Sequence, residues 1–265
     1  MDCECEQACC QCAKRAWIIT GGIDYTSAYY RRGYLQDDSG LILQPFLTAA
    51  RRHEFGDSLT AHPYVTSWNS FGLLDLDDPM AIMVEGMGGV FFTADKLNLD
   101  VNYAYFNNAP ADEDSDLQEI SLKLSYDVSR LWTGAEAPTF ALRPSATLSW
   151  ETYDQLGSED GYLELGVEPA WRFAWGCRNI GVTLPVQVGM SLDDYYFDAA
   201  GAEEFVGHVT AGLSVSTSLP PVGPCQNWFL TASIYYSRLL ADNLIAINGG
   251  EPNVLLGKVG LGFSF

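Results

Sequence analysis

The chain has 265 residues, of which 13% are aromatic and 25 are glycine, and it carries a formal net charge of −20. This acidity disfavours nucleic acid as a partner, because the phosphate backbone is negative too. No run of about 18 apolar residues occurs, which excludes a transmembrane helix, whereas one large all-β domain of this length is common.

The first fifteen residues form a cysteine-rich segment that contains Cys3, Cys5, Cys9, Cys10 and Cys12. Thiolates at this spacing can bind soft metal ions. However, the segment has no histidine and no second cluster at zinc-finger spacing, so we expect disulfides or a trimmed tail, with no metal and no cofactor. We interpret residues 1–15 as a periplasmic tail and residues 16–265 as one barrel domain.

Beyond the tail, apolar and polar residues alternate in twelve segments. These span 16–26, 41–51, 61–70, 81–93, 97–106, 117–128, 140–153, 162–173, 181–192, 204–217, 228–239 and 253–265. A period of two residues indicates strands with one apolar and one polar face, although the strands of a soluble sandwich also alternate. The even number, and a final strand that ends on the aromatic Phe265, favour an antiparallel transmembrane β-barrel of about 12 strands in a bacterial outer membrane.

If both chain termini are placed in the periplasm, the outward aromatic residues fall at the two ends of the predicted strands, and most acids fall at the outer end. Outward aromatic residues then form two girdles, as in membrane barrels. One group is Trp17, Tyr126, Phe140, Trp171, Phe173, Trp228, Phe263 and Phe265, and the other is Tyr25, Tyr103, Tyr105, Trp150 and Tyr236. Most acids fall in the outer connections, where they usually form a solvated rim. The run from Asp112 to Asp116 offers carboxylates to a divalent cation, although Leu117 stands where an EF-hand requires glycine.

Two further features concern the turns and the strands. Cys177 and Cys225 both fall in periplasmic turns, where an oxidising compartment permits a disulfide between them. Five prolines fall inside the predicted strands, where each removes a ladder hydrogen bond, so we expect bulges or kinks near them. They are Pro45, Pro63, Pro144, Pro169 and Pro185.

The run from Ser27 to Gly33, Ser-Ala-Tyr-Tyr-Arg-Arg-Gly, resembles the S-x-Y-x-x-R-G signature that opens the Gcw-chp family of bacterial proteins. The likeness continues through residues 64–69 and 99–106 and includes Glu119. It departs at Arg31, where the family tends to carry an aromatic residue, and in the cysteine-rich start. The resemblance implies an outer-membrane barrel, and it implies no particular activity.

The polar faces of the strands supply the residues that we expect to line the barrel interior. They are Asp24, Glu85, Asp100, Glu119, Lys123, Arg143, Glu164, Glu168, Arg172, His208 and Lys258. Ionisable groups at such positions must face water or one another. If water passes, the excess of acids predicts a passive, cation-leaning channel for small neutral or cationic solutes, surrounded by outer-membrane lipid. If the charges instead pair, the chain is a closed structural or surface-binding barrel with acidic extracellular loops.

An enzyme is a third class, which we do not expect. A barrel hydrolase needs a nucleophile and a base in mutual reach, and the only histidines are His53, His62 and His208. His62 with Ser67 and Asn69 superficially resembles the histidine, serine and asparagine set of outer-membrane phospholipases, but the spacing fits no working arrangement. We interpret His208 as a polar residue of the barrel wall.

Overall fold

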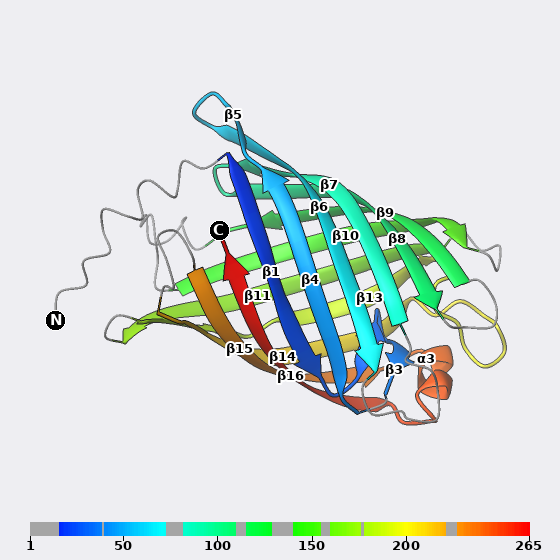
Figure 1. Ribbon diagram of the computed structural model, residues 1–265. Helices are drawn as coiled ribbons and strands as arrows, with labels where there is room; N and C mark the ends of the chain where they lie inside the picture. Colours follow the sequence, from blue (N-terminus) through cyan, green and yellow to red (C-terminus); the bar gives the residue numbers. More distant parts are fainter. Residues whose placement is uncertain are drawn as a thin grey trace.

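The computed structural model describes residues 16–38, 40–72, 82–109, 115–128, 140–154, 160–175, 178–220 and 227–265. It is almost entirely β structure, and twelve antiparallel wall strands close into one barrel (Figure 1). The strands are β1 (Trp17–Thr26), β4 (Ile42–Arg51), β6 (Leu59–Gly72), β7 (Ile82–Ala94), β8 (Leu97–Ala109), β9 (Ser115–Tyr126), β10 (Phe140–Asp154), β11 (Gly161–Trp175), β12 (Arg178–Thr183) with β13 (Val186–Asp193), β14 (Val206–Ser218), β15 (Asn227–Leu239) and β16 (Asn253–Ser264). The predicted fold class is confirmed.

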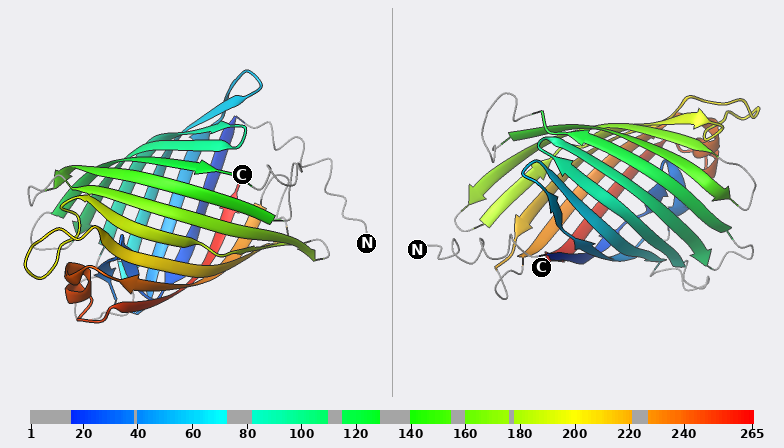
Figure 2. Two further views of the ribbon diagram at one scale, coloured as in Figure 1. Left: turned by 180° about the vertical axis from the view of Figure 1, so that it is seen from behind. Right: turned by 90° about the horizontal axis from the view of Figure 1, so that it is seen from above.

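The barrel closes where the first strand meets the last. β1 pairs with β16 from Thr20 opposite Ser264 to Thr26 opposite Lys258. β12 and β13 follow one another between the same neighbours, β11 and β14, and together form one wall strand. Both ends of the described chain lie at one end of the barrel (Figure 2), which we call the terminal end, and we call the opposite end the distal end.

The prolines lie where the hydrogen-bond ladder is incomplete. Pro185 separates β12 from β13, and the pairing of β4 with β6 is interrupted at Pro45, as expected. At Pro63, Pro144 and Pro169 the strands continue with regular pairing on one side, so the expectation of bulges there is wrong. On the other side of each proline, the pairing with the neighbouring strand is interrupted or has ended. Pro63 lies one residue beyond the pairing of β6 with β4, and Pro144 lies one residue beyond the pairing of β10 with β9. Pro169 faces the break between β12 and β13. A missing N–H is tolerated at such positions.

The outer face of the barrel is apolar. Val65 is 63% exposed, Val259 56%, Leu47 52% and Ile120 49%, although each lies in the middle part of a paired strand. Outward aromatic rings gather near the two ends, as predicted: the rings of Phe140 and Trp171 and of Trp228 and Phe263 touch at the terminal end. Monomeric soluble proteins rarely expose apolar surface on this scale.

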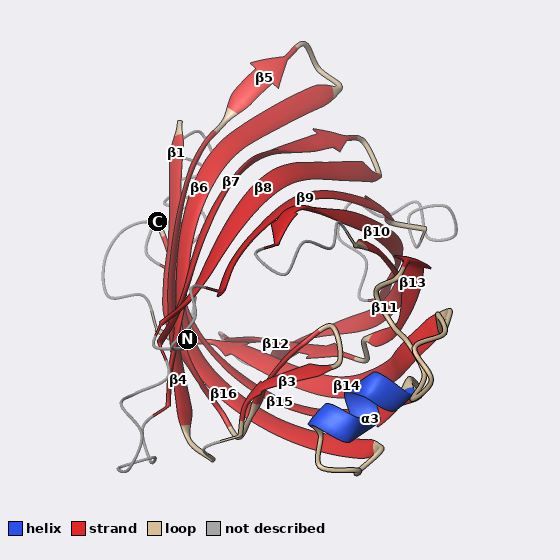
Figure 3. Ribbon diagram, turned by 90° about the vertical axis from the view of Figure 1, so that its right-hand side faces the viewer, coloured by secondary structure: helices blue, strands red, loops and turns tan. Residues whose placement is uncertain are grey.

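Three connections fold together at the distal end. They contain the short strands β2 (Tyr29–Arg31) and β3 (Tyr34–Asp37), residues 194–205, and the helix α3 (Asp242–Ile247), which Figure 3 shows beside β3. Their buried core consists of Tyr162, Tyr195, Tyr196, Leu239, Ala241, Leu244 and Val254. At the terminal end, β5 (His53–Phe55) pairs with the start of β6. Among the described residues, no helix has the length and apolar character to cross a membrane.

Ten described acids of the connections assigned outside lie at the distal end of the barrel. They are Asp37, Asp38, Asp116, Asp160, Asp193, Asp194, Asp198, Glu203, Asp242 and Glu251. The stretch from Asp112 to Asp114 lies outside the described residues, and so do all seven cysteines, including Cys177 and Cys225. The disulfide, the tail and the cation site in the acidic loops therefore stay predictions.

Candidate functional site: the barrel interior

The connection between β1 and β4 folds into the barrel instead of projecting from it. β2 and β3 pair as a hairpin, residues 29–37, which we call the lumen hairpin. The ring of Tyr29 lies 5.0 Å from the ring of Trp68 on β6. The guanidinium carbon of Arg31 lies 3.9 Å above the ring of Phe106 on β8. One loop of the chain therefore occupies part of the lumen.

The tip of the lumen hairpin is a two-residue turn. Arg31 and Tyr34 pair across it, and Arg32 and Gly33 have φ angles of 51° and 87°. Positive φ at both central residues is the type I′ geometry, which suits glycine but costs other residues roughly 1–2 kcal/mol. A β-carbon on Gly33 would lie 2.7 Å from Leu244 and 3.0 Å from the ring of His208. The backbone at the tip is therefore both strained and tightly packed.

Glu119 on β9 binds both arginines of the hairpin. Its Oε2 lies 2.7 Å from Arg31 Nη2, and its Oε1 lies 2.5 Å from Arg32 Nη2. Ser121 donates a further hydrogen bond to Oε1, and Glu151 on β10 lies 3.9 Å from Arg32 Nη1. The Glu119 side chain is only 5% exposed. Charge-assisted bonds of this kind offset the cost of burying the carboxylate, so the cluster fastens the hairpin to the wall.

Phenols fix the other side of the hairpin. Tyr196 donates a hydrogen bond to the carbonyl oxygen of Arg32 at 2.8 Å, and Tyr34 donates one to the carbonyl oxygen of Tyr195 at 2.6 Å. Burial raises the pKa of both donating phenols, so they keep the protons that these bonds require. The hairpin is thus held between an ionic contact and an aromatic cluster.

Four of the predicted interior charges form two ion pairs. Asp24 Oδ2 lies 2.5 Å from Lys258 Nζ, and Arg143 Nη1 lies 3.2 Å from Glu168 Oε1. Gly260 makes room for the first pair, because a β-carbon at that position would collide with the carboxylate of Asp24. These four charges cancel locally.

Three predicted interior acids form no ion pair with any described residue: Glu85, Asp100 and Glu164. Asp100 accepts a hydrogen bond from the phenol of Tyr64 at 3.0 Å, and Glu164 accepts one from the phenol of Tyr162 at 3.1 Å. Neutral donors satisfy these two carboxylates without cancelling their charge. The ion pairs of the described residues therefore leave these three carboxylates without a cationic partner.

The two remaining predicted interior bases are Lys123 and Arg172. Lys123 stands opposite Asp100 in the register of β8 and β9, but the described residues give it no ion pair. Arg172 lies exposed near the terminal end of β11. Our interior list missed Arg31 and Arg32, which belong to a loop and bring two positive charges inside. The single arginine before the glycine in the S-x-Y-x-x-R-G signature corresponds to Arg32, and no signal pointed to Arg31.

Two cavities lie beside the lumen hairpin. The larger, of about 460 Å³, is lined by hairpin residues and by β1, β4, β6, β7, β15 and β16. The smaller, of about 280 Å³, is lined by the hairpin and by β7 to β11. Tyr29, Glu85 and Met87 line both. The hairpin therefore divides the interior but leaves open space on two sides.

The residues considered for catalysis do not come together. His62 and Ser67 are five positions apart on one strand and point to opposite faces of the wall, and Asn69 shares the face of Ser67. His208 is 2% exposed, and its Nε2 lies 3.4 Å from the Tyr162 hydroxyl, as a wall residue should. No group of three or more metal-ligating side chains occurs among the described residues.

Several solved bacterial structures share the fold. The β domain of the Bordetella autotransporter Brka matches with a TM-score of 0.51 and 11% identity, over 94% of this chain and 98% of that one. The translocator domain of the Neisseria meningitidis autotransporter NalP matches with 0.51 and 11%, over 98% and 92%. The COG4313 outer membrane channel of Pseudomonas putida F1 matches with 0.51 and 10%, over 94% of each chain. No protein-family model and no curated protein matches the sequence, so the Gcw-chp resemblance stays a prediction.

Proposed function

We propose that this protein is a bacterial outer-membrane barrel that acts as a passive channel for small solutes and prefers cations, and that it belongs to the Gcw-chp family. The apolar outer face and the two aromatic girdles support contact with outer-membrane lipid. The shared fold with an outer membrane channel agrees with this proposal. We propose no catalytic role.

The observation that carries the channel is the pair of charged cavities beside the lumen hairpin. Glu85 lines both cavities, Asp100 and Glu164 line the smaller one, and none of the three forms an ion pair with a described residue. Fixed charges in a narrow space of low dielectric focus the field and raise the local concentration of counter-ions. Small cations or neutral solutes would pass more readily than anions.

A closed barrel is the second candidate, and the lumen hairpin is the observation that favours it. Arg31 and Arg32 reach Glu119 on the far wall, and the distal connections pack on the same hairpin. A barrel blocked in this way would act through its acidic distal surface, by binding a partner or divalent cations.

Planar-bilayer recordings distinguish the two candidates. Refolded, heat-modifiable protein should give stable conductance steps, and a salt gradient should give a cation-selective reversal potential. A triple variant, Glu85→Gln with Asp100→Asn and Glu164→Gln, should lose that preference, whereas Asp57→Asn in an exposed turn at the terminal end should keep it. Anion preference in the unmodified protein would rule out our assignment, and a folded but silent barrel would favour the closed one.

A further inference from the structure

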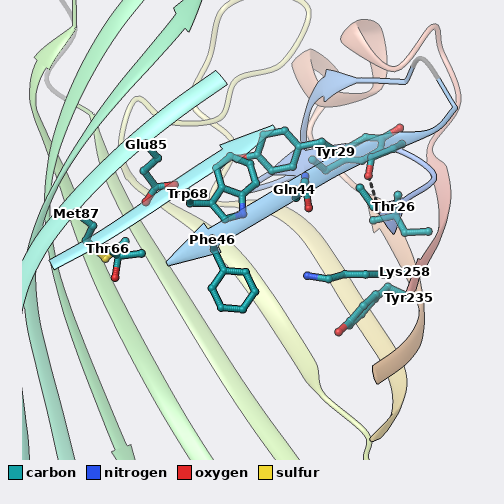
Figure 4. A pocket seen from close by; sticks show the side chains of 13 residues that line it. Thr26, Tyr29, Gln44, Phe46, Thr66, Trp68, Glu85, Met87, Tyr235 and Lys258 are labelled. Atoms are coloured by element: carbon teal, nitrogen blue, oxygen red, sulfur yellow. Dashed lines mark hydrogen bonds between the residues drawn. The ribbon is translucent and has the colours of Figure 1, made fainter. Parts of the chain in front are cut away.

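The larger cavity has the composition of a ligand site. Its volume of about 460 Å³ lies within the range of small-molecule pockets. Aromatic rings come from four separate elements: Tyr29 on β2, Phe46 on β4, Trp68 on β6 and Tyr235 on β15. Figure 4 shows these side chains around one shared space.

The rings present their faces at an angle to one another. Tyr29 and Trp68 are tilted by 46° with their centroids 5.0 Å apart, so they line two sides of a corner and do not form one flat platform. The face of an aromatic ring carries partial negative charge and attracts cations, most strongly at tryptophan. Met87 adds an adaptable apolar side chain to the same lining.

The cavity is lined by one carboxylate and one ammonium group. Figure 4 shows Glu85 on one side of the space and Lys258 on the other. Lys258 is paired with Asp24 at 2.5 Å, whereas Glu85 forms no ion pair with a described residue. The hairpin arginines are engaged by Glu119. Glu85, the one carboxylate in the lining, therefore faces the aromatic corner without an ion-pair partner among the described residues.

We propose that this cavity binds organic cations of the alkylammonium class, with the cation against the rings of Trp68 and Tyr29 and near the carboxylate of Glu85. Inorganic cations of similar charge hold their hydration shells more strongly and gain less from ring faces. A neutral sugar could stack on the rings but would gain no charge attraction from the carboxylate of Glu85. The inference deepens the proposed function, on which it rests, because it names the solute class that the channel would take.

Calorimetric titration of the folded protein tests the site without a membrane. Choline and tetraethylammonium are the probes, glucose is the neutral comparison, and a polyoxyethylene detergent is used because it contains neither sugar nor ammonium. We expect saturable binding of both ammonium ions and none of glucose. Glu85→Gln should weaken binding by at least about tenfold, because it removes the charge attraction to the ammonium group, and Trp68→Leu should abolish it.

Two matched control variants test whether any loss of binding is specific to the cavity. Glu168→Gln removes a carboxylate that lines neither cavity, and Trp175→Leu removes an outward tryptophan that is 77% exposed; both should bind like the unmodified protein. If Trp68→Leu does not fold, as judged by heat modifiability, Phe46→Leu replaces it. Glucose binding in place of ammonium, no ammonium binding, or ammonium binding that ignores both Glu85→Gln and the ring variants would overturn the proposal. Binding without conductance would refute only the channel, and conductance without binding would refute only the site.

Discussion

Arg32 at the tip of the lumen hairpin lies 2.5 Å from Glu119 on β9, so a loop that starts at β1 is fastened to the opposite side of the barrel. β10 stands farthest from β1 in the ring of strands, and β9 is its neighbour (Figure 3). This contact holds the hairpin across the lumen, so the channel that we propose would depend on the same ion pair that stabilises the hairpin.

Glu119→Gln should release the hairpin. The variant removes the carboxylate that both Arg31 and Arg32 bind and leaves them only Glu151, 3.9 Å from Arg32. Breaking one side of a buried ion pair costs about 3–5 kcal/mol, and we expect the lower end of that range because the side chains of Arg31 and Arg32 are 17% and 13% exposed. Urea unfolding followed by tryptophan fluorescence measures the loss, and bilayer recordings should show a larger single-channel conductance.

Glu168→Gln is the matched control for this prediction. It breaks the ion pair with Arg143, in which both side chains are 41% exposed. Exposed pairs contribute less than about 1 kcal/mol, and this one does not touch the hairpin. Equal losses in the two variants, or an unchanged conductance in Glu119→Gln, would mean that the hairpin is not held by the ionic contact.

Gly33→Ala should displace the hairpin for a steric reason. Gly33 has a φ of 87°, and its added β-carbon would lie 2.7 Å from Leu244 and 3.0 Å from His208. Gly40→Ala meets a similar φ of 93° but has no atom within 4 Å, so it isolates the backbone cost of roughly 1 kcal/mol. Overpacking typically adds about 1–3 kcal/mol. Denaturant midpoints of the two variants should differ by that amount, and identical midpoints would contradict the tight packing of the tip.

The wall could be predicted from the sequence, but the lumen hairpin could not. Alternation is a local property, so the twelve strands and their outward faces follow from neighbouring residues, and the same alternation placed Glu119 and Lys258 inside. The position of the hairpin depends on contacts between residues distant in sequence: Arg31 and Glu119 are 88 positions apart. A tyrosine- and arginine-rich loop of nine residues carries no periodic signal that would direct it inward. The predicted excess of interior acids was therefore too large.

Asp24→Asn should weaken cation preference by leaving Lys258 unpaired. The two groups are 2.5 Å apart, and Lys258 lines the larger cavity. An uncompensated ammonium there would oppose Glu85 and repel cations. We expect a several-fold fall in cation over anion permeability, measured from reversal potentials, and a matching fall in choline affinity. Asp24→Asn combined with Lys258→Met should restore both, and a double variant that stays as impaired as the single one would show that the carboxylate acts in another way.

Val65→Arg should prevent stable insertion into a membrane. Val65 lies near the middle of β6, pairs with Ala49 and Gly88 on its two neighbours, and is 63% exposed on the outer face. Arginine at the midplane of a barrel's lipid face costs about 2–4 kcal/mol. Phe55→Arg is the comparison, because Phe55 is similarly exposed at 59% but belongs to β5, beyond the terminal end of the wall. Refolding yields in lipid vesicles, read as the heat-modifiable fraction, should fall for Val65→Arg and not for Phe55→Arg. Equal yields would mean that the apolar belt does not face lipid, and the localisation that we propose would then have to be abandoned.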